Sequence, residues 1–379
     1  MINDLFVVTA IADIHFGAIK AETLYNELKL SFLSFIKDKR IDMIVICGDY
    51  YNSIINLNSK SSHLSLLFMK NLISIAKSEG IKYIRIIEGT LSHDNNQLNN
   101  FKVFENDTDI DFKIIMNVTE EVLSEGLRIL YVPEEYMENP DEYYAEYFSK
   151  KKYYDFIFGH GMFKESSFTS NDGETKISRA PIFDSKVFIN MCTGPIIFGH
   201  IHIKNTIRKH IFYIGSFSRW IYGEEESKGF MVFVYHRKEK WYVYQFIENK
   251  LARLFDTIEI LNLNHFTDGN KLVKIISDFK KDNLRIKIII DDVQKNVSYM
   301  INFLREYYTN KPGYKLEIIN KMISLKQQEV ENKVNKLLTE YDFVFDKKLP
   351  PEFKVQKFIK KRYQKDIEVD KIKEILYNN

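Results

Sequence analysis

The chain has 379 residues, of which 45% are hydrophobic, so its length allows two or three domains with a substantial core. Its 54 basic and 52 acidic residues give a net charge of +2, which excludes a uniformly basic chain but allows a local basic patch. The two cysteines, Cys47 and Cys192, are too few for a disulfide framework. The chain shows neither a signal-peptide pattern nor an apolar run of about 18 residues, so we expect a cytoplasmic protein without a membrane span.

Short apolar runs alternate with longer amphipathic segments in the first part of the chain. The spacing predicts strands at 5–13, 43–49 and 81–89, separated by helices at 22–39 and 63–80. This alternation is typical of an α/β sheet with helices on its outside.

Strands follow one another more closely in the next part of the chain. One helix is predicted around 140–151, and residues 164–180 are polar and loop-like. We therefore expect an α/β first domain at 1–248, built as a two-sheet sandwich flanked by helices. The additional strands are predicted at 112–118, 127–133, 154–160, 195–200, 210–216, 229–236 and 241–248.

A smaller α+β unit is predicted at 253–320. Helices are expected at 265–282 and 296–310, and strands at 284–292 and 314–320. This unit has too few apolar residues to suggest a catalytic domain of its own.

The last segment, 321–379, is predicted to be helical. An apolar stripe crosses 330–341, and a second stripe follows Pro350 and Pro351 at 354–376. These helices either pack against the body of the protein or dock on helices of a partner. Their position at the end of the chain, behind two prolines, favours docking.

Side chains that ligate metals follow five of the apolar strands. Residues two apart on an extended strand point the same way, so Asp13 and His15 are expected to face one ion together, as are His200 and His202. Because ligands collect at the carboxyl ends of strands in open α/β sheets, the set predicts two divalent ions bridged by one carboxylate, a geometry suited to phosphoryl transfer. His63, His210, His236 and His265 lack this setting and are predicted to be structural. The candidate residues are Asp13, His15, Asp49, Ser92, His93, Asp94, His160, His200 and His202.

The order DIH, GD, a His-Asp loop, GH and GHIH resembles the calcineurin-like metallophosphoesterases. The segment 199–230 is similar, more narrowly, to the SbcD-type nuclease subunit of double-strand-break repair complexes. In that family a GHxH strand is followed by a Gly-Ser turn, an Arg and a Gly-Glu-rich segment that closes with Lys-Gly-Phe. Here these are 215–216, Arg219, 223–225 and 228–230, and the similarity covers about 1–247 of the chain.

The resemblance implies a role for each candidate residue and the identity of the metal. His93 is expected beside the reacting phosphate as general acid or transition-state stabiliser, with Asp94 orienting its ring. The family is expected to use manganese, whereas the residues alone indicate only a borderline divalent ion. By resemblance, Asp13, His15 and His202 bind one ion, Asp49 bridges, and His160 and His200 bind the other.

Two positions depart from the pattern of the family. The family's loop reads Gly-Asn-His-Asp with the Asn amide on the second metal, whereas this chain has Ser92 before His93. Ser92, Thr90 or a water molecule is then the replacement ligand. Asn52 stands where the nuclease subfamily often has a DNA-handling histidine, and we expect Asn52 and Arg219 to position the substrate.

The motifs favour a DNA exonuclease or endonuclease subunit of an SbcCD-like complex, which binds an SbcC-like coiled-coil ATPase through its C-terminal helices. The unit 253–320 would then cap the site and contact DNA, and the lysines of 357–365 are further candidates for phosphate contacts. The alternatives are a small-nucleotide phosphodiesterase or phosphatase, and a DNA-binding subunit whose centre is catalytically weakened. The sequence also allows a homodimer, with helices 22–39 and 63–80 as the candidate interface.

Overall fold

The structure is a computed structural model, and it describes residues 4–106, 109–148, 152–166, 180–261, 263–266, 268–279, 282–290, 297–320 and 349–377. The chain divides into two compact units, Met1–Asp256 with Lys280–Leu284 and Thr257–Phe279 with Arg285–Asn379. The predicted mixed α/β class is confirmed. The helix expected over 330–341, and the rest of 321–348, lie outside the described residues.

A six-stranded sheet with the order β14-β13-β1-β2-β3-β4 forms one half of the first unit. The four strands β1 to β4 are parallel, and β13 adds antiparallel to β1 and pairs with β14. The strands are β1 (Leu5–Ile11), β2 (Met43–Cys47), β3 (Tyr83–Ile87), β4 (Asp111–Ile115), β13 (Gly229–His236) and β14 (Tyr242–Glu248).

A second six-stranded sheet has the order β11-β12-β10-β7-β6-β5. Its four central strands are parallel, and the edge strands β5 and β11 are antiparallel to their neighbours. The strands are β5 (Thr119–Val122), β6 (Arg128–Val132), β7 (Phe156–His160), β10 (Ile196–Gly199), β11 (Asn205–Ile207) and β12 (Ile211–Tyr213).

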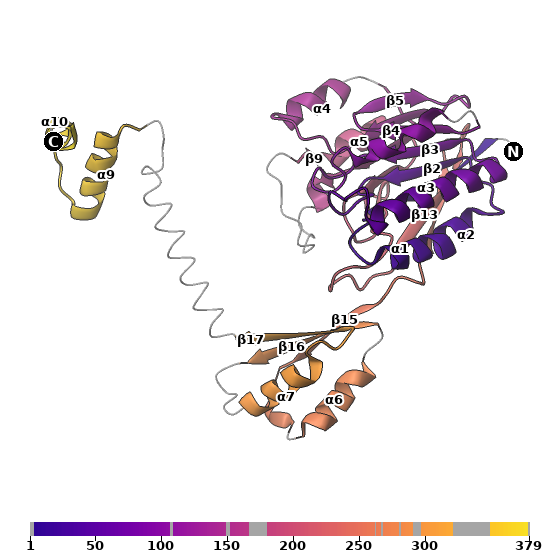
Figure 1. Cartoon of the computed structure of the whole chain (residues 1–379). Helices are drawn as coiled ribbons and strands as arrows, with labels where there is room; N and C mark the ends of the chain where they lie inside the picture. The colour runs from indigo at the N-terminus through magenta and orange to yellow at the C-terminus, as the bar shows by residue number, and fades with distance from the viewer. Residues whose placement is uncertain are drawn as a thin grey trace. The chain divides into compact units, whose positions relative to one another are not determined.

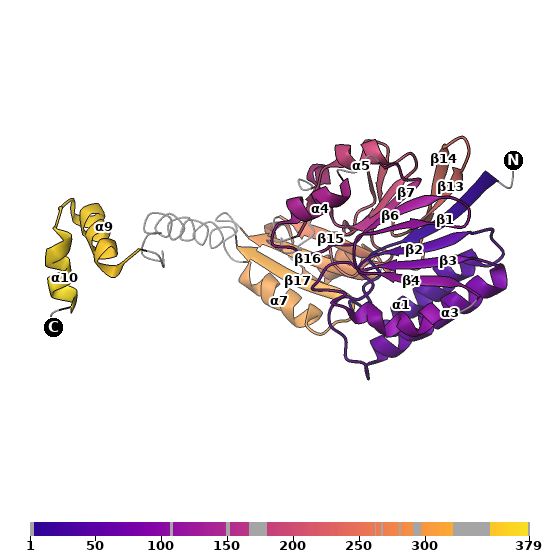
Figure 2. The ribbon, with the colours of Figure 1, turned by 90° about the horizontal axis from the view of Figure 1, so that it is seen from above.

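The two sheets pack face to face, and helices cover their outer faces (Figures 1 and 2). Helices α1 (Ala21–Glu27) and α3 (Lys60–Glu79) cover the first sheet, and α4 (Pro140–Phe148) and α5 (Ser185–Met191) cover the second. The core between the sheets is apolar and rich in aromatic rings, as expected when both faces of a largely parallel sheet are covered. It includes Val8, Val45, Ile87, Tyr131, Phe158, Ile197 and Phe212.

The first two predicted helices are present, with a local difference in the first. The segment predicted at 22–39 forms α1, a π-helical turn at Leu28–Leu33 and the short α2 (Ser34–Ile36). Helix α3 begins at a Ser59 cap, whose side chain accepts the backbone N–H of Ser62, and ends at Gly80 in the left-handed conformation.

Several short elements were not predicted. Strand β5 has half-buried and exposed residues only, and β11 has three residues, so neither has a continuous apolar run. Helix α5 has seven residues and falls below the length at which helical periodicity is clear. The others are a small two-stranded sheet of β8 (Met162–Phe163) and β9 (Ile182–Phe183), and 3₁₀ turns at Gln97–Asn106, Lys164–Ser166 and Leu263–His265.

The second unit contains a three-stranded sheet with the order β15-β16-β17 and two helices that contact each other. Alternate residues of β16, Leu284, Ile286 and Ile288, are buried, so one face of this strand packs inward. Four of the five elements were predicted, and β15 was not. They are β15 (Phe255–Ile260), α6 (Gly269–Asp278), β16 (Asn283–Ile290), α7 (Ser298–Tyr308) and β17 (Tyr314–Asn320).

The last described segment forms two helices where the sequence predicts one stretch at 354–376. Helix α9 (Pro351–Tyr363) ends at Gln364 in the left-handed conformation, and α10 (Val369–Tyr377) follows. The side chain of Gln356 donates a hydrogen bond to the carbonyl of Ile367 at 2.8 Å, which ties α9 to the connection that precedes α10. No helix in the described part of the chain has the length and hydropathy that a membrane span requires.

Candidate metal centre

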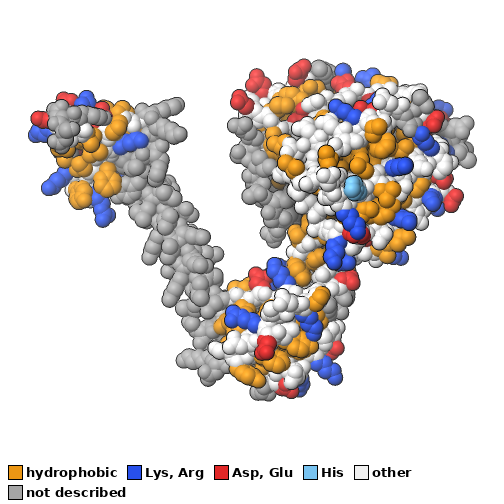
Figure 3. Space-filling view, in the orientation of Figure 1, with side chains coloured by type: hydrophobic (Ala, Val, Ile, Leu, Met, Phe, Trp, Pro, Cys, Tyr) orange, Lys and Arg blue, Asp and Glu red, His pale blue; other side chains and the backbone are white. Residues whose placement is uncertain are grey.

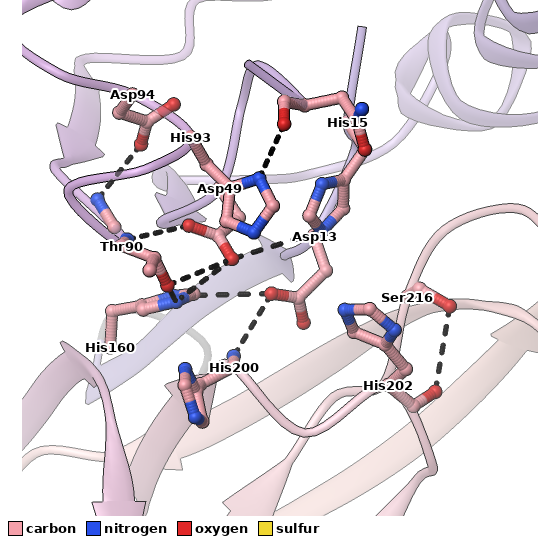
Figure 4. Close-up of polar contacts among 12 residues, drawn as sticks. Asp13, His15, Asp49, Thr90, His93, Asp94, His160, His200, His202 and Ser216 are labelled. Carbon is pink, nitrogen blue, oxygen red and sulfur yellow. Dashed lines mark hydrogen bonds and ion pairs between the residues drawn. The ribbon is translucent and has the colours of Figure 1, made fainter. Parts of the chain in front are cut away.

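The predicted site residues come from strands of both sheets and meet at their carboxyl ends. Asp13 and His15 follow β1, Asp49 follows β2, and the loop 89–94 follows β3, all in the first sheet. His160 ends β7, and His200 and His202 follow β10, in the second sheet. In Figure 4 the side chains of Asp13, Asp49, Thr90 and His160 point toward one another. The site therefore lies where the two sheets meet.

Seven of these residues form three groups that could hold a metal ion. In each group, one ligand atom from every member lies within 4.8 Å of the others. The groups mix carboxylates with imidazoles, which is the donor set of borderline divalent metals. They are Asp13 with His15 and His202, His15 with Asp49 and His93, and Asp49 with His160 and His200.

Asp49 belongs to two of the groups. Its Oδ2 atom lies 3.7 Å from Nε2 of His15 and 3.2 Å from Nε2 of His160. One carboxylate oxygen thus faces histidines that come from different sheets. This is the position that a bridging ligand occupies between two cations.

The backbone turns sharply at four of the candidate ligands. Asp13, His15, Asp49 and His200 have φ values of 49°, 51°, 49° and 90°, in the region that favours glycine. Such strain persists where the surrounding structure imposes it, and it concentrates at functional sites. The prediction that Asp13 and His15 converge because they alternate along an extended strand was therefore wrong in its reason. Strand β1 ends at Ile11, and the turn after it brings the two side chains together.

Gly48 allows the close approach of the second sheet to this turn. Its φ is 79°, and a Cβ atom at this position would lie 2.1 Å from Nδ1 of His160. Any larger residue would displace the imidazole, so glycine is required between β2 and Asp49.

The tautomer of His160 is set by the backbone. Its Nδ1 lies 2.9 Å from the carbonyl oxygen of Cys47, which can only accept a hydrogen bond, so Nδ1 carries the proton. Nε2 then points at the carboxylate of Asp49. A neutral imidazole nitrogen and a carboxylate oxygen repel each other unless a proton or a cation lies between them.

Buried atoms without partners indicate that the residues fit a bound cation. Among the described residues, none gives a hydrogen-bond partner to Oδ2 of Asp13 or to either ring nitrogen of His15, although these atoms are buried. Unsatisfied buried polar groups are costly, and a cation between them would remove the cost.

The protonation states follow from burial and from neighbouring charges. Burial raises the pKa of Asp13 to about 6. Burial would also raise the pKa of Asp49, but the neighbouring histidines, His160 first, outweigh it and hold this pKa well below its usual range. Burial lowers the pKa of His15 well below the ordinary value, so its imidazole is neutral, as a metal ligand must be.

His93 lies beside the ligands and is oriented by the backbone. Its Nδ1 is 2.6 Å from the carbonyl oxygen of Asn52, so Nδ1 donates and acid–base chemistry takes place at Nε2. The ring packs edge-on against that of His15, with centroids 4.8 Å apart. We expected Asp94 to orient this ring, but at Nδ1 the carbonyl of Asn52 does so instead.

Asp94 organises the loop that carries His93. Its two carboxylate oxygens accept the backbone N–H groups of Gly89 at 2.8 Å and of Tyr51 at 2.9 Å. Burial raises the pKa of Asp94 to about 7, and it is wholly enclosed. This residue therefore joins the loop after β3 to the loop after β2.

The sequence left Ser92, Thr90 or a water molecule to replace the Asn ligand of the family's loop. Of the two residues, Thr90 lies at the site. Ser92 is exposed. Thr90 is buried, and its Oγ1 lies 3.2 Å from Oδ2 of Asp49 and 3.3 Å from Nε2 of His160. Its backbone N–H also donates to Oδ1 of Asp49 at 2.6 Å. Thr90 therefore positions the carboxylate that lies between the two histidine groups.

Sequence reasoning missed Glu134. This residue follows β6, separated from it by one proline, and its Oε2 lies 3.1 Å from Nδ1 of His200 and 3.7 Å from Nε2 of His160. Burial alone would raise the pKa of Glu134, but His200 and His160 outweigh it and lower the pKa, which keeps the side chain ionised. The signal was present, because Glu134 is polar and follows an apolar strand like the other candidates.

Residues later in the segment 199–230 hold His202 in place. Oε1 of Glu224 lies 3.2 Å from Nδ1 of His202, and Lys228 donates to the His202 carbonyl at 3.0 Å. The ring of Trp220 lies against those of His15 and His202, with centroids 4.4 and 4.7 Å away. A carboxylate behind a histidine fixes its orientation, which is how such residues assist metal binding.

Arg219 and Asn52 were expected to position the substrate, but the contacts that the structure shows for them are with other parts of the protein. Arg219 is buried, and its guanidinium donates to the backbone carbonyls of Glu224 at 2.8 Å and Ala252 at 3.2 Å. These bonds hold the 219–226 loop and do not support the expected contact with substrate. Asn52 uses its carbonyl to orient His93.

The four histidines predicted to be structural lie outside the three candidate groups in the described part of the chain. His63, His210 and His265 are exposed, and His236 stacks on Trp241.

No protein-family model matches this sequence, and no curated protein is significantly similar to it. Among solved structures, the chain is similar to a cold-active protein tyrosine phosphatase from a psychrophilic Shewanella species and to a point mutant of a cold-active protein tyrosine phosphatase. Both matches have 12% identity and cover 65% of this chain and 79% of the other, with TM-scores of 0.29 and 0.31. Similarity at this level establishes neither a common fold nor a common activity.

Proposed function

We propose that this protein hydrolyses phosphoesters with two divalent cations, and that its substrate is a nucleic-acid phosphodiester. The observation that carries the proposal is the position of Asp49, whose Oδ2 faces His15 at 3.7 Å and His160 at 3.2 Å. A carboxylate shared by two groups of imidazoles is what a pair of cations needs as its bridge.

The residues that would hold the cations follow from the three groups. Asp13, His15 and His202 would hold one, and His160 and His200 would hold the other, with Asp49 between them. Such cations, when bound, stabilise negative charge on a phosphate and make water more acidic. The imidazoles of His15 and His160 are fixed by burial and by the Cys47 carbonyl, so little reorganisation is needed on binding.

His93 is suited to act on the phosphate as an acid. Because its Nδ1 donates to Asn52, its Nε2 is the atom that can give a proton to a leaving oxygen or stabilise charge. It is half-buried and adjoins both His15 and Asp49, so a phosphate at the cluster would contact it.

The finer proposal is a DNA nuclease subunit of the SbcD type, with Mn²⁺ as the metal and an SbcC-like coiled-coil ATPase as the partner. It is supported by the resemblance of the motifs and by the helical pair at the end of the chain. Helices α9 and α10 expose several large apolar side chains, as a surface that docks on partner helices would. These are Phe353, Phe358, Tyr363, Ile375 and Leu376.

The contact with DNA is proposed to run through phosphates. On the face shown in Figure 3, Lys and Arg side chains are interspersed with acidic and apolar ones and do not form one continuous patch. Local clusters, such as the lysines of α9, would then supply the contacts.

The test uses the purified full-length chain with Mn²⁺ on linear DNA, single-stranded DNA and a chromogenic phosphodiester. We expect metal-dependent cleavage that falls about 10²–10⁴-fold in His93→Ala, the range of general acid catalysis. His63→Ala, which removes an exposed histidine, is the matched control and should retain full activity.

Each other outcome has a defined meaning. Turnover of the chromogenic ester without cleavage of DNA would favour a small-nucleotide phosphodiesterase over a nuclease. Binding of DNA without turnover of any substrate would favour a weakened DNA-binding subunit. Equal activity in wild type and His93→Ala would remove the assigned role of His93.

A further inference from the structure

Glu134 brings an additional carboxylate to the group formed by Asp49, His160 and His200. Its side chain is 1% exposed, and its Oε2 lies 3.1 Å from Nδ1 of His200 and 3.7 Å from Nε2 of His160. The same oxygen is 3.5 Å from Oγ1 of Thr90, which in turn contacts Asp49. One oxygen of Glu134 is therefore directed at the two imidazoles proposed to hold the second cation.

The other oxygen of Glu134 holds the carboxylate in this orientation. Oε1 accepts a hydrogen bond from the hydroxyl of Tyr136, two residues further along the chain. With Oε1 engaged in this way, Oε2 is directed toward the histidines. A carboxylate whose rotamer is fixed by a second hydrogen bond is pre-organised as a ligand.

We propose that Glu134 is a direct ligand of the second cation, together with Asp49, His160 and His200. This inference rests on the proposed two-cation site, and it identifies the donor that replaces the amide expected in the loop 89–94. At the second cation, Thr90 contributes its hydroxyl from that loop, whereas Ser92 is exposed and His93 belongs to the group with His15 and Asp49. The donor comes from the segment after β6 in the second sheet instead of from the loop after β3.

The replacement changes the charge of the site. A neutral amide oxygen leaves the second cation with one carboxylate, whereas Glu134 supplies another beside Asp49. Carboxylate oxygens favour Mn²⁺ and Mg²⁺ over metals that prefer all-imidazole sites. The second cation should therefore bind more tightly than a serine or a water ligand would allow.

The rival explanation is that Glu134 only orients His200. In that case Nδ1 of His200 donates a proton to Oε2, and the ring would bind the cation through Nε2. The two explanations predict different positions for the cation. A direct ligand places it about 2.0–2.2 Å from Oε2, as in a metal–carboxylate bond, whereas an orienting residue leaves it beyond the reach of that oxygen.

The first experiment measures Mn²⁺ binding to the full-length chain by titration calorimetry, with metal content determined in parallel. We expect wild type to bind two ions and Glu134→Ala to lose one of them or to bind it at least about tenfold more weakly. Glu134→Gln, which keeps an amide oxygen, should lie between them. Thermal unfolding of each variant without metal checks that it is folded.

Glu135→Gln is the matched control. Glu135 is a buried neighbour, but its carboxylate accepts from the backbone of Val118 at 3.0 Å and from the side chain of Asn117 at 2.8 Å. Neither partner belongs to a candidate metal group. The Glu135 variant should bind both ions with wild-type affinity.

The second experiment is a crystal structure with Mn²⁺ and its anomalous signal. An ion within about 2.0–2.2 Å of Oε2 supports the inference. An ion bound by His200 while Oε2 keeps its distance overturns it and leaves Glu134 as a positioning residue. Two ions of unchanged affinity in Glu134→Ala also overturn it. Wild type that binds no ion would instead contradict the proposed function.

Discussion

The carboxylate of Asp13 accepts a hydrogen bond from the backbone N–H of His200, with 2.9 Å between Oδ1 and N. Asp13 follows β1 of the first sheet and His200 follows β10 of the second, so this bond joins the two sheets at the candidate metal centre. The other oxygen, Oδ2, is buried without a hydrogen-bond partner among the described residues. One side chain thus uses one oxygen to hold the fold and presents the other to a ligand.

Asp13→Asn should separate these two roles. The amide oxygen can still accept the N–H of His200, but the charge that a cation needs is lost. We expect Mn²⁺ affinity to fall by at least about tenfold, with metal-free stability close to that of wild type. Calorimetry and denaturant unfolding would measure both quantities.

Asp13→Ala is the comparison, because it removes both oxygens. The N–H of His200 then loses its acceptor, which should cost about 1–3 kcal/mol of unfolding free energy. Equal losses of stability in the Asn and Ala variants would show that the bond to His200 does not hold the sheets together.

Trp220 should report metal binding by fluorescence. Its ring centroid lies 4.4 Å from that of His15, while the second tryptophan, Trp241, packs on His236. In Trp241→Phe, where Trp220 is the remaining tryptophan, Mn²⁺ should quench the emission with a saturating curve, because a paramagnetic ion quenches nearby fluorophores. Trp220→Phe should show little change, and an unquenched Trp241→Phe protein that binds Mn²⁺ would contradict the site.

Glu121 should make the stability of the fold depend on pH. Arg85 of β3 is wholly buried, and its guanidinium donates to both carboxylate oxygens of Glu121 in β5, at 3.0 and 2.8 Å. Burial opposes ionisation of Glu121, but Arg85 outweighs it and lowers the pKa from 4.5 to about 2. Because β3 belongs to the first sheet and β5 to the second, this ion pair joins the two sheets.

Because the folded-state pKa of Glu121 is depressed, its contribution is present above about pH 4.5 and is lost as the pH falls toward 2. The drop from 4.5 to about 2 corresponds to roughly 3 kcal/mol. Glu121→Gln should therefore be less stable than wild type at pH 6, and the difference should shrink below pH 4.5. Urea unfolding at several pH values measures this, and a difference independent of pH would refute the assignment.

Asp94 should control the stability of the loop that carries His93. Asp94→Ala leaves the buried N–H groups of Gly89 and Tyr51 without their acceptors, which should cost about 1–3 kcal/mol for each. Asp94→Asn keeps one acceptor and should lie between Asp94→Ala and wild type. We also expect loss of turnover with Mn²⁺ binding largely retained. Wild-type stability of Asp94→Ala in denaturant unfolding would contradict this.

DNA binding should depend strongly on salt if phosphate contacts supply the affinity. The logarithm of the binding constant should fall linearly with the logarithm of salt concentration, and each lysine that contacts a phosphate should contribute about 0.9 to the slope. Lys357→Gln, Lys360→Gln and Lys361→Gln, on α9, test this in fluorescence anisotropy. An unchanged slope in the triple variant would place the DNA contacts elsewhere.

The sequence predicted the strands and long helices of the first unit because their signals are local. Apolar runs marked β1, β2, β3, β7 and β10, and helical spacing with a terminal Gly80 marked α3. The elements that it did not predict have weak local patterns. Strand β5 has the sequence TEEV and therefore lacks an apolar run. The partner of its Glu121 is an arginine 36 residues away, which a local pattern cannot reveal.

The candidate metal ligands were predicted from residue type and position, since carboxylates and imidazoles directly after apolar strands converge in an α/β sheet. Their geometry was not, because it depends on turns and on contacts between distant segments. The left-handed backbone at Asp13 and Asp49, and the Cys47 carbonyl behind His160, have no signature in the chain itself.

The sequence by itself determined that acidic and imidazole side chains would collect at strand ends, because hydrophobic periodicity and residue chemistry are properties of short segments. Only the tertiary structure decided that Glu134 and Thr90, and not Ser92, stand beside Asp49 and His160. That choice depends on how two sheets pack, and packing brings together atoms that the order of residues keeps far apart.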